Sequence, residues 1–168
     1  MHCKLGFSQV VCRVIFVGFM KQISNFSASD LTSDGQRALY AWYGDIAARG
    51  EMPARAGFDP LDFPAALPFL VLVNIEASPR RYRTRLVGTQ VVEANGRDGT
   101  GHYFDETAGT EAAVERIEAV VAGRRPIFST DVPMTWSPKD YKNYSVLSLP
   151  LSSDGTTINM IMYCLDFR

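Results

Sequence analysis

Few side chains in this 168-residue sequence have the type and spacing that nucleophilic or metal chemistry needs. The three cysteines, Cys3, Cys12 and Cys164, show no paired spacing, and the two histidines, His2 and His102, lie far apart. Neither a disulfide framework nor a zinc site is therefore indicated. The sequence also contains no Ser/His/Asp or Cys/His motif and no His-Glu-x-x-His pattern. We expect a protein without catalytic residues or a metal site, and not an enzyme.

Three arginines, Arg81, Arg83 and Arg85, alternate along an expected strand and so share one of its faces. We interpret this face as solvated or paired with carboxylates, for which Glu76 and Asp131 are candidates. An anion or nucleic-acid site is the alternative, but three arginines make a small basic patch. The chain has 17 basic and 18 acidic residues, a net charge of −1, which also argues against nucleic acid as a partner.

Composition indicates a single folded domain. The chain is 46% hydrophobic and 21% charged, which is enough apolar material for a core and excludes a disordered or low-complexity protein. Its length is about that of one domain. Cysteines without paired spacing are typical of a reducing compartment, so we expect a cytoplasmic protein.

Residues 1–30 differ in composition from the rest of the chain. The run Val10–Met20 is almost wholly apolar, but it is too short for a membrane span and carries Arg13 in its middle. A secretory signal fits this pattern loosely. We favour the interpretation that this N-terminal extension includes an over-long gene model, with the native start near Met20, before a single domain over residues 31–168.

The folded part combines helices with strands. Ser33 and Gln36 fit a capping box, and an amphipathic helix is expected to follow it and to end near Gly50. Later in the chain we expect strands over residues 69–76 and 81–87, helices over 90–94 and 110–123, and strands over 128–136, 144–151 and 157–167. This order predicts an α+β domain with one antiparallel sheet.

The final strand is apolar on both faces, with Met160 and Cys164 on one and Ile161 and Tyr163 on the other. Both faces must therefore be covered. The helix over residues 110–123 is expected to cover one. The helix that carries Trp42, or a second subunit, is expected to cover the other.

Five motifs follow one another over roughly residues 31–167. They are Gly50–Arg55, the proline-rich run Asp59–Pro68, Arg83–Thr89, Gly96–Gly101 and Leu149–Ser152. In this order they resemble the PAS domain family, and within it a bacterial subgroup of stand-alone, single-domain proteins. The resemblance implies a five-stranded antiparallel sheet with helices packed on one face and an N-terminal helix. It also implies a role in signal transduction.

The cofactors of well-known PAS proteins can be compared with this sequence residue by residue. Flavin photosensors of this family carry a reactive cysteine directly after a Gly-Arg-Asn, whereas here Gly96-Arg97-Asp98 is followed by Gly99. At that position the subgroup more often has an apolar residue. Haem-binding members usually place a histidine on the helix before the third strand, and residues 110–123 contain none. We expect neither a flavin adduct nor histidine-ligated haem, and the cofactor is left unknown.

Two functions fit the resemblance. The favoured hypothesis is a protein–protein interaction module that forms a homodimer or docks to a signalling partner such as a histidine kinase. Its expected interface is Leu39, Trp42, Tyr43, Ile46, Ile161 and Tyr163. The alternative is a sensor that holds a small apolar or aromatic ligand between sheet and helices. Its expected ligand-binding residues are Tyr82, Arg97, His102, Phe104, Phe128, Met134, Trp136, Tyr144 and Met160.

Overall fold

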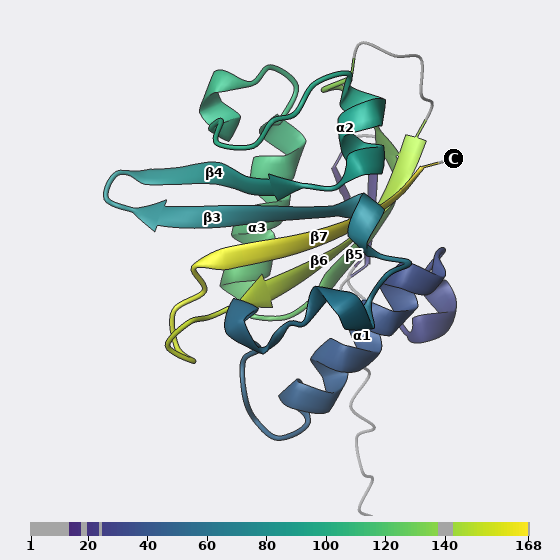
Figure 1. The fold of residues 1–168 in the computed structure, drawn as a ribbon, viewed down its shortest axis with the longest axis vertical. Coiled ribbons are helices and arrows are strands. Elements are labelled where there is room, and N and C mark those ends of the chain that lie inside the picture. Colours follow the sequence, from purple (N-terminus) through teal and green to yellow (C-terminus); the bar gives the residue numbers. More distant parts are fainter. Residues whose placement is uncertain (1–13, 18–19, 24, 138–142, 168) are drawn as a thin grey trace, which may run out of the picture.

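The computed structural model describes residues 14–17, 20–23, 25–137 and 143–167, and its strands form one antiparallel sheet in the order β1-β2-β5-β6-β7-β3-β4 (Figure 1). The strands are β1 (Val14–Val17), β2 (Met20–Ile23), β3 (Leu70–Ala77), β4 (Arg80–Val87), β5 (Ile127–Pro133), β6 (Asn143–Leu151) and β7 (Met160–Phe167). Strands β3 to β7 are the five-stranded antiparallel sheet that the sequence predicts.

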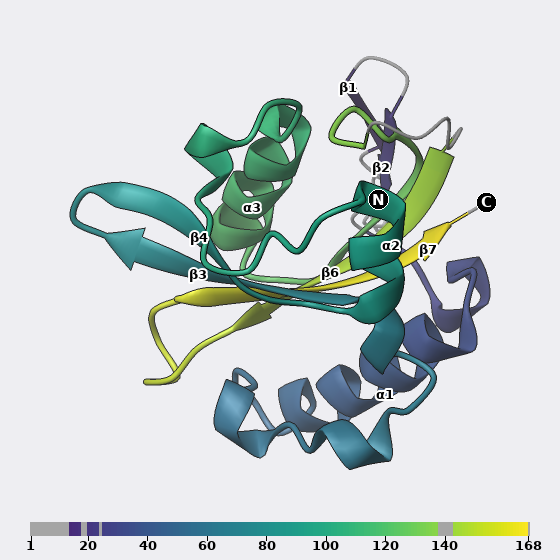
Figure 2. The same cartoon turned by 45° about the horizontal axis from the view of Figure 1, so that its top comes forward.

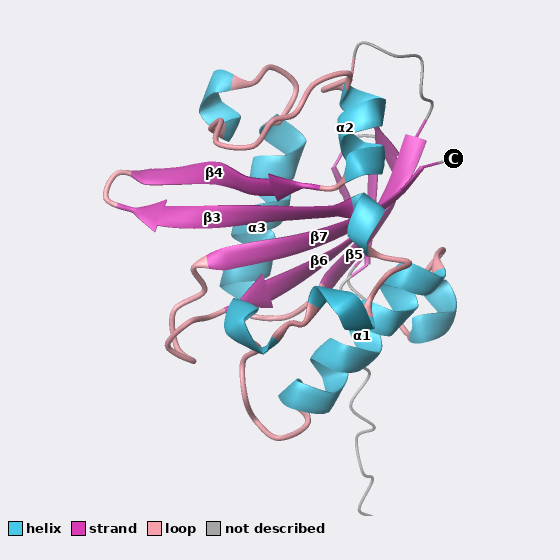
Figure 3. Ribbon diagram, in the orientation of Figure 1, coloured by secondary structure: helices cyan, strands magenta, loops and turns pink. Residues whose placement is uncertain are grey.

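Among the residues that the structure describes, three α-helices and five short 3-10 helices surround this sheet (Figure 3). The α-helices are α1 (Asp34–Ala47), α2 (Thr89–Asn95) and α3 (Glu111–Gly123). The 3-10 helices are η1 (Ala28–Asp30), η2 (Arg55–Gly57), η3 (Pro60–Asp62), η4 (Leu67–Phe69) and η5 (Phe104–Glu106). A membrane-spanning helix needs about 20 residues, and no helix in the described ranges is long and apolar enough to cross a membrane.

Strands β1 and β2 were not expected, because they belong to the segment placed outside the domain. Strand β2 pairs with β5, with Lys21 opposite Thr130, and thereby extends the sheet at its β5 edge. The predicted native start near Met20 concerns the chain before β2, and residues 1–13, 18 and 19 lie outside the described residues. His2, Cys3 and Cys12 lie there as well.

Helix α1 begins at the predicted cap. The Ser33 hydroxyl accepts a hydrogen bond from the Gln36 backbone N–H at 3.2 Å, which satisfies one of the donors at the start of the helix. The Gln36 side chain does not complete the capping box. Instead its Nε2 donates to the Cys164 carbonyl oxygen at 3.1 Å and to the Ser145 hydroxyl at 3.3 Å. This fully buried amide therefore fixes α1 to β6 and β7.

The helices pack on opposite faces of the sheet, with α1 below it and α3 above it in Figure 2. Side chains alternate across β7, so Met160, Met162 and Cys164 pack on the α1 side while Ile161 and Tyr163 pack on the α3 side. The chain therefore covers both apolar faces of this strand itself. Helix α1 covers the face of β7 for which a second subunit had been the alternative cover.

Two β-bulges interrupt the alternation that the sequence predicts. In β5 the register shifts between Ser129 and Val132, and Asp131 has a φ of 56°. Phe128 consequently packs toward α1, whereas Val132 packs toward α3.

The second bulge lies in β4. Leu72 pairs with Leu86 and Val73 with Thr84, which leaves Arg85 as the extra residue. Strict alternation along this strand would place Leu86 on the same face as Tyr82 and Thr84. The extra residue instead turns Leu86 toward solvent, where it is 41% exposed.

Candidate functional site: a cavity between α3 and the sheet

A cavity of about 120 Å³ lies between the sheet, α2 and α3. This is well above the roughly 10–15 Å³ that one water molecule needs. Six elements contribute apolar side chains to its wall, namely Val71 from β3, Val87 from β4, Val91 from α2, Phe104 from η5, Val146 from β6 and Leu165 from β7. Such a wall is typical of a small-molecule site, provided that a few polar groups converge within it.

Two polar side chains of the cavity wall, Arg116 and Trp136, meet at the Tyr144 hydroxyl. Arg116, which is only 3% exposed, reaches from α3 and donates a hydrogen bond from Nη2 to the Tyr144 hydroxyl at 3.0 Å. The indole Nε1 of Trp136 donates to the same oxygen at 3.4 Å, and the two rings meet edge to face with centroids 5.8 Å apart. The Tyr144 hydroxyl oxygen therefore accepts hydrogen bonds both from Arg116 on α3 and from Trp136, which follows β5.

Tyr163 lies in the same wall of the cavity. Its hydroxyl donates to the Ala113 carbonyl oxygen at 3.3 Å. Burial raises the pKa of Tyr163 well above its ordinary value, and the nearby Arg116 guanidinium opposes that rise. The phenol is therefore neutral at physiological pH, and the positive charge at this end of the cavity is that of Arg116.

The mouth of the cavity is formed by the glycine-rich segment after α2. Arg97 is exposed there, and the Asn95 side chain donates to its carbonyl oxygen at 3.1 Å. Gly99 lines the same rim. Within the described part of the chain the lining thus includes two arginines, Arg97 and Arg116, and no aspartate or glutamate.

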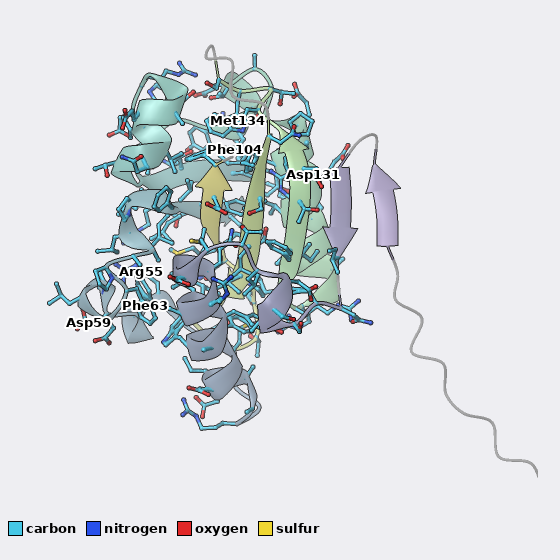
Figure 4. The ribbon with its side chains drawn as sticks, turned by 90° about the vertical axis from the view of Figure 1, so that its right-hand side faces the viewer. Arg55, Asp59, Phe63, Phe104, Asp131 and Met134 are labelled. Carbon is cyan, nitrogen blue, oxygen red and sulfur yellow. The ribbon has the colours of Figure 1, made fainter. Side chains whose placement is uncertain are left out.

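Four of the nine predicted ligand-binding residues line the cavity: Arg97, Phe104, Trp136 and Tyr144. Tyr82 and Met134 belong to the core on the same side of the sheet without lining it. Figure 4 shows Phe104 and Met134 near one end of the sheet, away from Arg55 and Phe63.

Three of the predicted residues lie elsewhere and correct the expectation. His102 is exposed. Phe128 is buried on the α1 side because of the bulge in β5, and Met160 is buried there because alternation along β7 directs it away from α3. Alternation that ignores the bulge misplaces Phe128, whereas Met160 lies where alternation along β7 puts it, on the face opposite Ile161.

Sequence reasoning missed Thr84, Arg116 and Tyr163, which also line the cavity. A signal for Arg116 was present, because it lies three residues after Ala113 and four before Val120, and helical spacing puts these on one face. Because arginine is charged, this position was not counted with the apolar residues of the same helix face.

The predicted interaction surface is mostly internal. Leu39 and Tyr43 are buried between α1 and the sheet, while Ile161 and Tyr163 are buried beneath α3. The two other members, Trp42 and Ile46, are half-buried, and the Trp42 ring packs against Phe58 and Phe63 with centroids 5.5 and 6.1 Å away. These six residues do not form an exposed apolar face, because α1 packs its own apolar side chains against the sheet and α3 covers the side of β7 that carries Ile161 and Tyr163.

Of the three arginines predicted to share a face of β4, Arg81 pairs with carboxylates, though with different ones from those expected, while Arg83 donates to the Gly101 carbonyl oxygen at 3.3 Å. Arg81 donates to Asp105 at 2.9 Å and to Glu106 at 2.8 Å, and its guanidinium lies 3.5 Å from the centre of the Tyr103 ring. The Arg81 hydrogen bond holds the pKa of Asp105 below its ordinary value. Glu76 instead accepts a hydrogen bond from the Tyr103 hydroxyl at 3.2 Å. Arg81 thus fixes η5, and with it Phe104, at the edge of the cavity.

Metal and thiol chemistry find no support in the described part of the chain. Its His, Cys, Asp and Glu side chains form no group of three that could hold a metal ion. Cys164 is buried on the α1 side, and burial raises its pKa to about 12. The thiol therefore stays protonated at neutral pH and is a poor nucleophile.

In a comparison with protein families, the chain matches a model described as a PAS domain over residues 31–165. No curated protein and no solved structure matches the chain. The matched range contains α1, the five central strands almost to their end, and every residue that lines the cavity. Strands β1 and β2 lie outside it.

Proposed function

Because the chain belongs to the PAS domain family, whose members are sensing and signalling modules, we propose that it is a sensor with its small-molecule ligand in the cavity between α3 and the sheet. In this proposal the protein binds its ligand without transforming it. The occupied and empty forms would differ in how they engage a second copy or a signalling partner.

The observation that carries the proposal is a polar cluster set into an apolar cavity. Burying a guanidinium is costly in a protein interior unless hydrogen bonds compensate for lost water. Here Arg116 is buried beside a void, with the Tyr144 hydroxyl as a partner. Apolar walls with a few convergent polar groups are the usual form of a small-molecule site.

The interaction hypothesis, which the sequence favoured, depended on an uncovered apolar face of the sheet. Since α1 covers that face, interaction enters the proposal only as the output of the sensor. Ligand binding can shift a dimer or a complex only by the difference in its affinity for the two states. The cavity is therefore the first place to test.

The test is native mass spectrometry of the full chain, gently purified from cells, and compared with the same sample after denaturation. We expect an additional mass of a few hundred daltons or less that denaturation releases. Trp136→Ala should abolish this mass, because it removes part of the wall and one donor to Tyr144. Trp42→Ala is the matched control, since Trp42 packs on the other side of the sheet.

Circular dichroism and thermal unfolding establish that both variants fold. Bare protein in every sample, confirmed after addition of cell extract to the purified chain, would contradict the proposal. So would a ligand that Trp136→Ala retains and Trp42→Ala loses, because it would place the ligand on the α1 side.

A further inference from the structure

One hydroxyl group in the wall of the cavity has no hydrogen bond. Five of the described lining residues carry a hydroxyl, and four of these hydroxyls have partners. Thr107, Thr110 and Tyr163 donate to backbone carbonyl oxygens, and the Tyr144 oxygen accepts two hydrogen bonds. The fifth hydroxyl is that of Thr84 on β4, and no group among the described residues donates to it or accepts from it.

Thr84 is buried, and its backbone groups are already used. The residue is only 7% exposed. Its N–H donates to the His102 carbonyl oxygen at 2.9 Å, and its carbonyl oxygen accepts from the Gly101 N–H at 2.8 Å. Its side chain lies on the α3 side of the sheet, as Tyr82 does. Burying a hydroxyl without a hydrogen bond costs free energy, and a ligand that supplies the missing partner would recover it.

The size of the cavity limits the body of the ligand. Its volume is about 120 Å³, and an apolar protein cavity of about 150 Å³ holds one benzene molecule. The enclosed part of a ligand therefore has about six to eight non-hydrogen atoms. The surrounding wall is mostly hydrocarbon, with Val71, Val87, Val146 and Leu165 from the sheet and Phe104 from η5. A compact hydrocarbon ring or short chain matches this wall.

We propose that the cavity binds a small uncharged molecule with a compact hydrocarbon body and one hydroxyl or carbonyl group, and that Thr84 recognises this group by a hydrogen bond. A threonine hydroxyl both donates and accepts, so it pairs with either group. An ion placed against Thr84 would find no opposite charge in that side chain to offset its lost hydration. This inference deepens the sensor function proposed above and rests on it.

The experiment compares phenol with toluene, which has a methyl group in place of the hydroxyl, and with benzoate, which is charged. Each is titrated into the isotope-labelled full chain to about 5 mM, enough to detect millimolar dissociation constants. The NMR signals of the two indole N–H groups report the site. Trp136 lines the cavity, whereas Trp42 packs on the other side of the sheet and is the internal control. Trp42→Phe assigns the two signals.

We expect phenol to shift the Trp136 signal and to bind more tightly than benzoate. Thr84→Val removes the hydroxyl and keeps the branched shape of the side chain. It should weaken binding of phenol about 10-fold, because the ligand hydroxyl loses its partner, and leave binding of toluene unchanged. Thr84→Ser, which restores a hydroxyl, should retain phenol. Thr89→Val is the matched control, because Thr89 is an exposed residue of α2 that does not line the cavity.

Thermal unfolding of the empty protein separates recognition from a structural role of Thr84. Because its hydroxyl has no partner among the described residues, Thr84→Val should unfold at the same temperature as the unsubstituted chain or at a higher one. A clearly lower unfolding temperature would mean that the hydroxyl holds the fold together, and would count against recognition. Circular dichroism establishes the fold of each variant, and Thr84→Ala tests the same hydroxyl if Thr84→Val does not fold.

The proposal is overturned if folded Thr84→Val keeps its affinity for phenol, if benzoate binds more tightly than phenol, or if no probe shifts the Trp136 signal. These results separate it from the sensor function. A ligand mass released in the native experiment would leave the sensor function standing in each of these cases. Bare protein in that experiment, together with an unshifted Trp136 signal for all three probes, would remove both.

Discussion

The two faces of the sheet are built from the same strands, yet they are packed in different ways. On the α1 side, Phe128, Leu147 and Met162 are completely buried within one cluster of apolar side chains. On the α3 side the same strands contribute Val146 and Leu165 to a cavity of about 120 Å³. The alternation of β6 and β7 thus supplies one layer with completely buried side chains and one layer with room for a ligand.

Each layer also contains a buried polar side chain, and the two side chains differ in charge and in surroundings. Gln36 is neutral, and the sheet and Thr32 provide partners for both ends of its amide. Arg116 carries a charge and lies beside the cavity, with Tyr144 as a partner. The Gln36 amide, with partners at both ends, fixes one arrangement of α1 on the sheet, whereas Arg116 places a charged side chain in the wall of the cavity. The comparison teaches that the α1 layer holds the more completely buried side chains, whereas the α3 layer contains the cavity in which the ligand is proposed to bind.

The largest expected effect comes from removing one leucine from each layer. Leu147→Ala should lower the free energy of unfolding by about 3–5 kcal/mol, because it leaves a new hole where the side chain was completely buried. Leu165→Ala should cost about 2 kcal/mol, near the lower end for such changes, because this side chain already borders a cavity. Urea titration of both variants measures the difference. Equal losses would show that the two layers are equally well packed.

Two glycines of α1 test how closely the α1 layer is packed. A Cβ on Gly35 would lie 2.9 Å from the Ala66 Cα, so Gly35→Ala must displace backbone and should cost about 1–3 kcal/mol. A Cβ on Gly44 would meet nothing within 4 Å. Gly44→Ala should therefore stabilise the protein by about 0.5–1 kcal/mol through helix propensity. Thermal unfolding gives both values, and a neutral Gly35→Ala would mean that α1 packs loosely after all.

The last expected effect, which depends on pH and not on a substitution, is a loss of stability at alkaline pH. Burial raises the pKa of Cys164 from 9.0 to about 12, so above pH 9 the unfolded thiol loses its proton while the folded one keeps it. The unfolded state then binds fewer protons, and the free energy of unfolding falls as pH rises, by at most about 1.4 kcal/mol per pH unit from this group. Urea titrations between pH 8 and about pH 10.5 measure this slope.

Cys164→Ala is the comparison for the alkaline experiment. Its stability should fall less steeply over the same pH range, because the thiol contribution is gone. Tyr43 on the same side of the sheet has a pKa raised to about 12, so some decline will persist above pH 10 in both proteins. An unchanged slope in Cys164→Ala would show that water reaches the thiol and that the α1 layer is not sealed.

Local patterns in the sequence were sufficient for the elements of the fold. Ser33 marks the start of α1, the alternation of Met160 to Phe167 marks β7, and the turn before Arg80 marks the hairpin of β3 and β4. Each of these signals involves residues within a few positions of one another. The same local reasoning identified Phe104, Trp136 and other aromatic residues of the cavity wall by their type.

The sequence by itself determined the order of the α-helices and strands from α1 onward, the family and the need to cover both faces of β7. Only the tertiary structure decided which helix covers which face, where β1 and β2 add to the sheet, and that Arg116 is buried beside a cavity. The bulges at Arg85 and Asp131 show why. A bulge arises from the pairing of two strands distant in the sequence, and it reverses the facing of every later side chain, so a pattern read along one strand cannot reveal it.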